Sequence, residues 1–212
     1  MAKISYDKVQ DYLISLVPPR DSEMQAMEKY AARTKFPIIG PAAGYVCYQI
    51  ARMIGARSVF ELGSGYGYST AWFARAVKEN NGEVVHHVVW DEKLSTMARG
   101  HLSRLGFEPL IQYHVAEAVA TLRQTPGPFD LIFNDIDKEG YPESLPLIKE
   151  KLRRGGVLII DNMLWHGQIL DSKDREKTTA AIRKFTKTIT TDPDWIVSLA
   201  PVRDGMIIAY KK

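Results

Sequence analysis

The spacing of apolar residues divides the chain near residue 57. Up to that point apolar residues recur every three or four positions, which predicts helices over about 9–16, 23–33 and 42–54. The first of these stretches ends before two consecutive prolines, and the prolines and glycine of 35–41 mark a loop between the other two. We therefore expect an N-terminal helical extension over residues 1–56.

Beyond residue 57, short β-branched runs alternate with stretches of helical period. We expect strands at 58–62, 84–89, 110–114, 131–134 and 157–160, and helices at 69–78, 94–105, about 116–122, about 142–152 and 177–189. Two last strands, at 195–200 and 206–210, are joined by a turn short enough for an antiparallel pair.

This alternation is typical of a doubly wound α/β sheet with right-handed crossovers. The sequence contains no internal repeat and no stretch with the composition of an interdomain linker. It therefore predicts a single domain over residues 1–212, with the α/β core at 57–212.

The composition limits the partners and the location. The 212 residues are 45% hydrophobic, which is enough for one sizeable core. The formal charge of +3 comes from scattered Lys and Arg, so we expect no nucleic-acid partner and no membrane attachment. The single cysteine, Cys47, excludes an intrachain disulfide, fits a reducing compartment and is expected in the core. Because the start of the chain lacks an apolar segment and no run approaches about 18 apolar residues, we expect a cytoplasmic protein.

Two strands that end in acid give the strongest chemical signal. Asp135 and Asp161 each follow an apolar run, and the interval between them fits a crossover helix and a parallel return strand. If these strands are neighbours about 4.8 Å apart, both acids lie at the carboxyl edge, where open α/β sheets bind ligands. With the amide oxygen of Asn162 they form a set of hard oxygens suited to Mg²⁺ or Ca²⁺, and Lys138 adds a cation or base. The alternative to a metal site is a purely structural role, in which Asp161 caps the next segment and Asp135 is a strand-end residue.

A glycine-rich turn follows the first strand of the core. The segment Glu61-Leu62-Gly63-Ser64-Gly65-Tyr66-Gly67-Tyr68-Ser69 leads into a helix, so its backbone can approach a ligand closely. The dinucleotide fingerprint needs glycine at its sixth place, which Tyr68 occupies. Glu61 is unfavourable beside a pyrophosphate but suits a cationic amino group, such as the methionine part of S-adenosylmethionine. The alternative is plain tight packing of the backbone.

These motifs resemble those of the cation-dependent class I O-methyltransferases, a family that includes the catechol and caffeoyl-CoA O-methyltransferases. The glycine-rich turn is similar to motif I of the family. Three further elements match in order and spacing: Asp135-Ile136-Asp137-Lys138…Tyr141, Gly155-Gly156…Asp161-Asn162-Met163-Leu164-Trp165-His166-Gly167, and the closing turn Pro201-Val202-Arg203-Asp204-Gly205. The resemblance covers nearly the whole chain and is weakest before residue 35.

The resemblance implies a fold and a set of roles. The fold is a Rossmann-like seven-stranded sheet in the order 3-2-1-4-5-7-6, with strand 7 antiparallel. Asp135, Asp161 and Asn162 would be the metal ligands, with Mg²⁺ as the expected ion and Ca²⁺ or Mn²⁺ as alternatives, and Lys138 would be the catalytic base. S-adenosylmethionine would be the cofactor. Its expected contacts are Glu61, Gly63, Ser64, Gly65, Ser69, Asp91, Glu117 and Asp135. A homodimer is expected by family analogy alone.

The chain departs from the family pattern at the end of the second strand. Members usually carry an acid there that holds the ribose hydroxyls, but Val89 occupies this position. Asp91 is the expected replacement. Asn134 is a smaller departure, since an apolar residue usually precedes the first metal-binding aspartate.

The function that the resemblance implies is methyl transfer from S-adenosylmethionine to a hydroxyl of a small aromatic acceptor with two adjacent hydroxyls. Such a hydroxyl is mostly protonated at pH 7, and a divalent ion chelated by both oxygens lowers its pKa and orients the ring. Two alternatives stay open. One is a different acceptor, such as a nucleic acid or a small amine. The other is a cofactor-binding protein of the same fold without catalysis, which Val89 favours.

Overall fold

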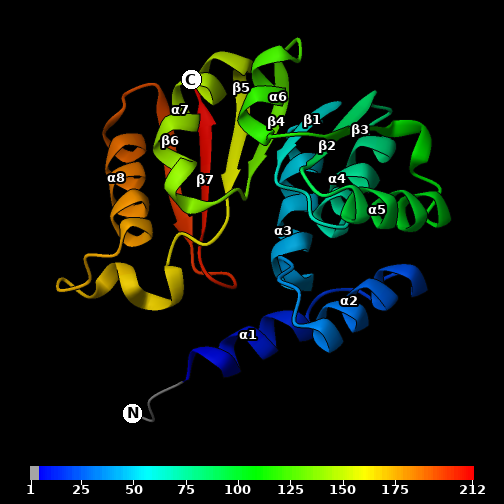
Figure 1. Ribbon diagram of the computed structural model, residues 1–212, viewed down its shortest axis with the longest axis horizontal. Coiled ribbons are helices and arrows are strands. Elements are labelled where there is room, and N and C mark those ends of the chain that lie inside the picture. The colour runs from blue at the N-terminus through cyan, green and yellow to red at the C-terminus, as the bar shows by residue number, and fades with distance from the viewer. Residues whose placement is uncertain (1–4) are drawn as a thin grey trace.

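A seven-stranded sheet runs through the centre of the molecule in the computed structural model, which describes residues 5–212 (Figure 1). The strands lie in the order β3-β2-β1-β4-β5-β7-β6, and only the pairs that involve β7 are antiparallel. Both the order and the orientation confirm the prediction. The strands are β1 (Ser58–Leu62), β2 (Val84–Val89), β3 (Ile111–Val115), β4 (Phe129–Asn134), β5 (Leu152–Ile160), β6 (Trp195–Ala200) and β7 (Met206–Lys211). The expectation for the start of the chain falls mostly on residues 1–4, outside the described residues.

The helices also form where the apolar spacing predicts them. They are α1 (Tyr6–Ser15), α2 (Ser22–Thr34), α3 (Gly40–Met53), α4 (Tyr68–Glu79), α5 (Glu92–Arg104), α6 (Ala118–Gln124), α7 (Tyr141–Lys151) and α8 (Lys177–Thr191). Three short 3-10 helices, η1 (Glu108–Leu110), η2 (Lys138–Gly140) and η3 (Trp165–Leu170), lie in the connections. No helix among residues 5–212 is long and apolar enough to cross a membrane.

Two local features differ from the prediction. Strand β5 begins at Leu152 rather than at 157, because Leu152 already pairs with Phe129 of β4. An irregular segment with Gly155 at φ +73° follows this pair, before the regular pairing resumes at Val157. The glycines and basic residues at 153–156 interrupt the apolar run by which the sequence would indicate a strand. Helix η3 was not expected, and its backbone takes positive φ at His166 and Gly167.

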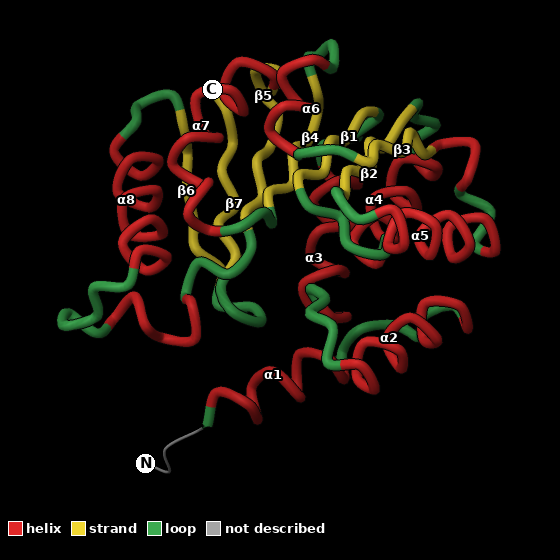
Figure 2. The backbone as a smooth tube through the Cα atoms, viewed as in Figure 1, coloured by secondary structure: helices red, strands yellow, loops and turns green. Residues whose placement is uncertain are grey.

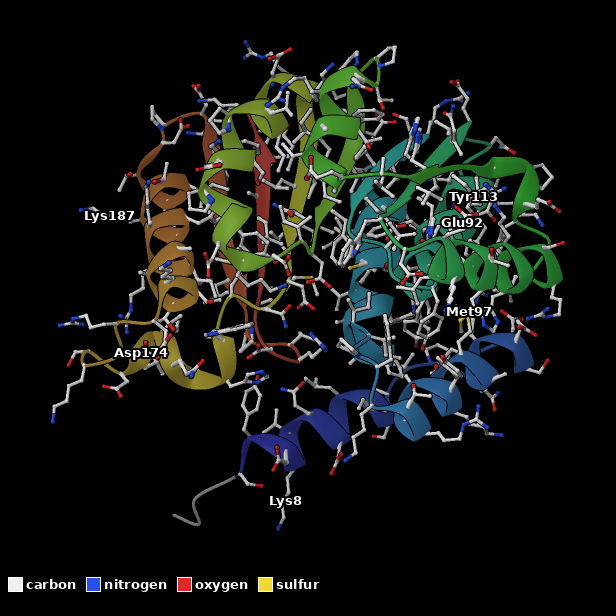
Figure 3. All side chains as sticks on the ribbon, in the orientation of Figure 1. Lys8, Glu92, Met97, Tyr113, Asp174 and Lys187 are labelled. Atoms are coloured by element: carbon white, nitrogen blue, oxygen red, sulfur yellow. The ribbon has the colours of Figure 1, made fainter. Side chains whose placement is uncertain are left out.

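The loop from η3 to α8 is fixed by Asp174, which accepts hydrogen bonds from the Glu176 amide and the Thr179 hydroxyl (Figure 3).

Helices cover both faces of the sheet (Figure 2). Successive side chains of a strand point to opposite faces, so each central strand contributes to two apolar clusters. Val59, Leu131 and Ile159 pack with helices α3 to α5 on one face. Phe60, Ile132 and Leu158 pack with α6 to α8 on the other. Cys47 is fully buried in the first cluster, as predicted.

The pairing register aligns the ends of the three central parallel strands. Leu62 of β1 pairs with Asn134 of β4, which in turn pairs with Ile160 of β5. The residues that follow these strands therefore leave the sheet at the same carboxyl edge. Helices α1 and α2 lie beyond that edge in Figure 1, and the β6–β7 turn reaches down to it.

Helix α1 is attached to the β6–β7 turn, although the two segments lie at opposite ends of the sequence. The hydroxyl of Tyr6 donates to the carbonyl oxygens of Pro201 and Arg203. Gln10 donates from Nε2 to the Pro201 carbonyl at 3.3 Å and accepts from the Arg203 amide at 2.7 Å. Lys8 points away from the turn into solvent (Figure 3). The N-terminal helix thus holds the backbone of this turn in place.

Gly44 of α3 lies where the helix packs most closely against α4, and replacing it with alanine should destabilise the fold. A Cβ at this position would lie 2.5 Å from Cδ1 of the buried Trp72 and closer still to Nε1. We expect Gly44→Ala to lower the free energy of unfolding, measured in urea, by about 1–3 kcal/mol because the core is overpacked.

Gly100 of α5 provides the matched control for this prediction. A Cβ there meets only the guanidinium of Arg104, at 3.4 Å, so alanine fits without strain. We expect Gly100→Ala to raise the free energy of unfolding by about 0.5–1 kcal/mol through helix propensity. A Gly44→Ala protein as stable as the wild type would contradict the packing argument.

Candidate functional site

The turn between β1 and α4 is shaped by glycines in left-handed conformations. Gly63, Gly65 and Gly67 have φ of +87°, +50° and +92°. A Cβ on Gly63 would lie 2.6 Å from the carbonyl oxygen of Asp135, so only glycine allows this approach of two backbones. Ser64 ties the turn to β2, because its amide donates to the Val88 carbonyl and its hydroxyl accepts from the Val88 amide, both at 2.9 Å.

A pocket opens between this turn and the loop before α3. The loop contributes residues 36–39, the turn contributes residues 63–66, and Tyr68, Ser69 and Asp135 complete the lining. The ring of Phe36 lies close to Gly65, where an added Cβ would be 3.2 Å from it. The loop therefore covers the glycine turn and leaves a narrow space, with apolar residues on the loop side and glycines and polar side chains on the turn side.

Glu61, the penultimate residue of β1, is a fully buried acid just before the glycine turn. Neither of its carboxylate oxygens has a hydrogen-bond partner among the described residues. Burial raises the pKa of Glu61 to about 7, although the nearby hydroxyls of Ser69, Thr70 and Ser64 act to lower it. A buried acid without a partner is unfavourable unless a cationic or donor group of a ligand meets it.

Asp135 and Asp161 meet at the carboxyl edge, as the sequence predicts. Asp161 is fully buried; its Oδ2 accepts from Arg203 Nη1 at 2.6 Å, while its Oδ1 has no partner among the described residues. Burial first, and then the charge of Asp135, raise the pKa of Asp161 above its ordinary range, while the Arg203 guanidinium acts to lower it. Asp135 Oδ1 accepts from Lys138 Nζ at 2.6 Å, and Lys138 also donates to the Ile136 carbonyl at 3.2 Å.

Asn162 follows Asp161 in a left-handed conformation with φ +61°. Its amide nitrogen donates to Asp204 Oδ2 at 3.3 Å, which leaves the amide oxygen for another partner. The other oxygen of Asp204 accepts from the backbone amide of His166 at 2.6 Å. The β6–β7 turn therefore orients the segment that follows β5.

The oxygens of Asp135, Asp161 and Asn162 fit a divalent cation. Among residues 5–212 no group of three acidic, histidine or cysteine side chains is placed to hold a metal ion, so the candidate set consists of two carboxylates and one amide. Carboxylate and amide oxygens suit Mg²⁺ and Ca²⁺. The buried, unpartnered Oδ1 of Asp161 is the observation that favours a cation, because a buried acid oxygen otherwise lacks compensation.

Two of the predicted cofactor contacts serve as helix caps. Asp91 Oδ1 accepts from the amides of Lys93 and Leu94 at the start of α5. Glu117 uses both oxygens in the same way at α6, at 2.8 and 2.6 Å. Both capping bonds of Asp91 go to one oxygen, whereas Glu117 uses both of its oxygens in capping α6. Val89, at the position where the family has its acid, is buried.

Asn134 has a structural account that the sequence did not supply. Its Nδ2 donates to the hydroxyl of Ser144 at 3.0 Å, and Ser144 donates to the Tyr141 carbonyl at 2.9 Å. The Tyr141 hydroxyl donates to the Asp161 carbonyl at 3.0 Å. This chain of hydrogen bonds joins the ends of β4 and β5 through α7. The unusual Asn134 was the only signal, since its partners lie on another element.

Arg203 is the site residue that sequence reasoning missed. It lies in the β6–β7 turn, where the motif specifies only the proline, the aspartate and the glycine. Its guanidinium contacts Asp161 from 42 positions away along the chain. A contact of such range has no local sequence signal.

Comparisons with known proteins found a matching family model and several relatives. The family model described as O-methyltransferase matches residues 22–212. A catechol O-methyltransferase of Mycobacterium tuberculosis is 33% identical over 82% of this chain and 80% of its own length. A catechol O-methyltransferase of Niastella koreensis is 28% identical over 98% of both chains. The crystal structure of an O-methyltransferase from Bacillus cereus in complex with SAH has a TM-score of 0.87 at 26% identity, covering 98% of this chain and 100% of that chain.

Proposed function

The chain belongs to the O-methyltransferase family, and on this premise we propose that it transfers a methyl group from S-adenosylmethionine to one hydroxyl of a small catechol-like acceptor, assisted by a divalent metal ion. The observation that carries the proposal is the pair Asp135 and Asp161 at one sheet edge, with a buried oxygen of Asp161 that has no partner in the part of the chain that the structure describes. Two relatives named catechol O-methyltransferase support the acceptor class.

The pocket beside the glycine turn is the proposed cofactor site. Gly63, Ser64 and Gly65 would bring backbone amides to the methionine part, and Ser69 lines the same pocket. Glu61 would pair with the amino group of the cofactor, which compensates its burial. Asp91 would contact the ribose through its second oxygen. Glu117, with both oxygens committed to α6, has the weakest support in the set.

Asp135, Asp161 and Asn162 would hold the metal ion. When bound, the ion acts as a Lewis acid that lowers the pKa of the acceptor hydroxyl and as a template for both of its oxygens. Lys138 Nζ, fixed by Asp135 and the Ile136 carbonyl, would take up the hydroxyl proton or stabilise the resulting oxyanion. Because methyl transfer is an in-line displacement, the chain contributes mainly by positioning the two reactants.

Transfer of labelled methyl from S-adenosylmethionine to 3,4-dihydroxybenzoate tests the proposal. We expect turnover with Mg²⁺, loss of turnover in excess EDTA and recovery when metal is restored. Turnover that is insensitive to EDTA would contradict the metal assignment and leave the methyltransferase assignment intact. Cofactor binding without turnover on any dihydroxy aromatic would favour the binding-only alternative.

The affinity for the cofactor should depend on pH through Glu61. Its carboxylate form pairs with the ligand amino group, and its pKa without ligand is about 7. Because the acid form loses this pairing, affinity for S-adenosylhomocysteine should fall as the pH drops below 7, by about tenfold per unit at most. Calorimetric titrations in metal-free buffer between about pH 5.5 and 8 measure this dependence.

Two variants control the pH prediction. Glu61→Gln should bind more weakly and lose most of the pH dependence, since it has no proton to exchange. Glu83→Gln, at an exposed ion pair with Arg57, should retain the wild-type profile. An unchanged profile in Glu61→Gln would assign the dependence to another group.

A further inference from the structure

Arg203 occupies one oxygen of a residue that the proposed function assigns to metal binding. Its Nη1 lies 2.6 Å from Asp161 Oδ2. The Asp161 side chain has no exposed surface, whereas 30% of the Arg203 side chain is exposed. The guanidinium therefore contacts the buried carboxylate from the solvent side of the site.

We propose that Arg203 competes with the divalent ion for Asp161 and so lowers the affinity of the site for metal. The proposal rests on the proposed metal assignment and adds a residue that tunes it. Arg203 acts through Asp161 and is a positioning residue rather than a catalytic one.

The charge balance of the site supports competition. Asp135 is paired with Lys138 and Asp161 with Arg203, each at 2.6 Å. Each of the two acids thus has one cation beside it before any metal arrives. A divalent ion that enters this arrangement gains the attraction of the carboxylates but is repelled by both cations. Removal of Arg203 therefore leaves a more negative site with both oxygens of Asp161 available.

The backbone around Arg203 is held independently of its guanidinium. Its amide donates to Gln10, its carbonyl accepts from Tyr6, and its φ is +52°. A non-glycine residue in this conformation is strained and persists where its surroundings fix it. Helix α1 supplies that constraint, and Figure 1 shows the β6–β7 turn above α1. The arginine is therefore directed at Asp161 by contacts that do not involve the ion pair.

A cleft beside Arg203 gives the guanidinium a place to move when the ion pair opens. The cleft lies between α2 and the loop before α3, and Arg203 forms part of its wall together with Phe36, Pro37 and Ile38. The displaced side chain would stay partly solvated there, so metal binding does not require burying an unpaired guanidinium. Competition is thus sterically possible without unfolding the turn.

Binding of Mn²⁺ to the full-length protein tests the proposal, because binding is measured apart from methyl transfer. Electron paramagnetic resonance of free Mn²⁺ gives the dissociation constant for the wild type and for Arg203→Gln. We expect Arg203→Gln to bind Mn²⁺ about tenfold more tightly, which corresponds to about 1.4 kcal/mol. A merely structural role predicts the opposite sign, since loosening the turn would misplace Asn162 and Asp161.

Arg153 offers a matched control. Its Nε lies 2.5 Å from Asp130, a partly buried acid at the amino edge of the sheet, far from the proposed metal ligands. Arg153→Gln should leave Mn²⁺ binding unchanged. Equal or weaker binding in Arg203→Gln, with wild-type binding in Arg153→Gln, overturns the proposal.

Two further variants complete the experiment. Asp161→Asn should lose Mn²⁺ binding; if it binds as the wild type does, the metal assignment itself fails and the competition with it. Loss in Asp161→Asn without a gain in Arg203→Gln overturns competition alone. Should Arg203→Gln not fold, Arg203→Met, which keeps an unbranched stem of similar length and removes the charge, should likewise tighten Mn²⁺ binding about tenfold. Unchanged or weaker binding there overturns the proposal equally.

Discussion

Lys138→Gln is expected to lower kcat for methyl transfer by about 10²- to 10⁴-fold, the range found when a positioned acid–base group is removed. Lys138 Nζ is held by Asp135 and by the Ile136 carbonyl at the carboxyl edge of the sheet. Glutamine keeps a donor for these partners but cannot accept a proton. The Kd for S-adenosylhomocysteine should stay close to that of the wild type, because the glycine turn is untouched.

Lys149 of α7 provides the control for this prediction. It forms ion pairs with Asp192 and Asp194 at 2.7 Å, at the end of α7 that lies away from the site. Lys149→Gln should leave kcat unchanged. If Lys138→Gln retained wild-type kcat, Lys138 would be an ion-pair partner of Asp135 without a role in proton transfer. A loss that disappears at high pH would instead indicate that the acceptor is already ionised there.

Asp161→Asn should separate activity from stability. The variant removes a charged oxygen ligand, so we expect metal-dependent methyl transfer to fall by about 10²- to 10³-fold, consistent with several kcal/mol of charge stabilisation by the ion. The unfolding free energy of the metal-free protein should not fall at pH 8. Burial and Asp135 raise the pKa of Asp161, so the folded state favours an uncharged group at this position.

The sign of the pH effect follows from that raised pKa. An acid whose pKa is higher in the folded state than in the unfolded state binds more protons when folded, so stability rises as the pH falls below the folded pKa. Protonation of Asp161 therefore adds to the stability of the metal-free wild type as the pH falls from 8 to about 5, while His86, His87 and His114, whose pKa values burial lowers, act in the opposite direction. Asp161→Asn should lack the contribution of Asp161, so its stability should rise less, or fall more, than that of the wild type over this range, as measured by urea unfolding. Asp192→Asn, at a partly exposed ion pair, is the control for both activity and stability. Destabilisation of Asp161→Asn at pH 8 would contradict the interpretation.

The fold was predictable because its signals are local. The apolar period changes at the start of the core, and an acid lies at or next to the end of each of the three central parallel strands: Glu61, Asp135 and Asp161. The family resemblance then supplied the order of the strands, which periodicity alone does not determine. A homodimer, a cytoplasmic location and the absence of a nucleic-acid partner stay predictions.

The parts that escaped prediction depend on contacts between distant elements. The pairing of Arg203 with Asp161 joins the last turn to β5, and the bond of Asn134 to Ser144 joins β4 to α7. The burial that raises the pKa of Glu61 is also a product of packing. Asp91 and Glu117 have local sequence signals that fit two roles. An acid just before a helix can cap that helix, and this role competes with contact to a ligand.

Strand β7 follows β6 along the chain, yet it lies inside the sheet between β5 and β6. Until its six residues have left the ribosome, β5 has an open edge and β6 has no partner. A chain that terminates before Met206 would present unpaired strand edges, which promote aggregation. It would also lose the strand pairing that positions Gly205. The hydrogen bond from the Met163 amide to the Gly205 carbonyl, which orders the segment after Asp161, would be lost with it. Pairing of β7 therefore both closes the sheet and orders the segment after Asp161, so we expect a chain cut before Met206 to aggregate without partial activity.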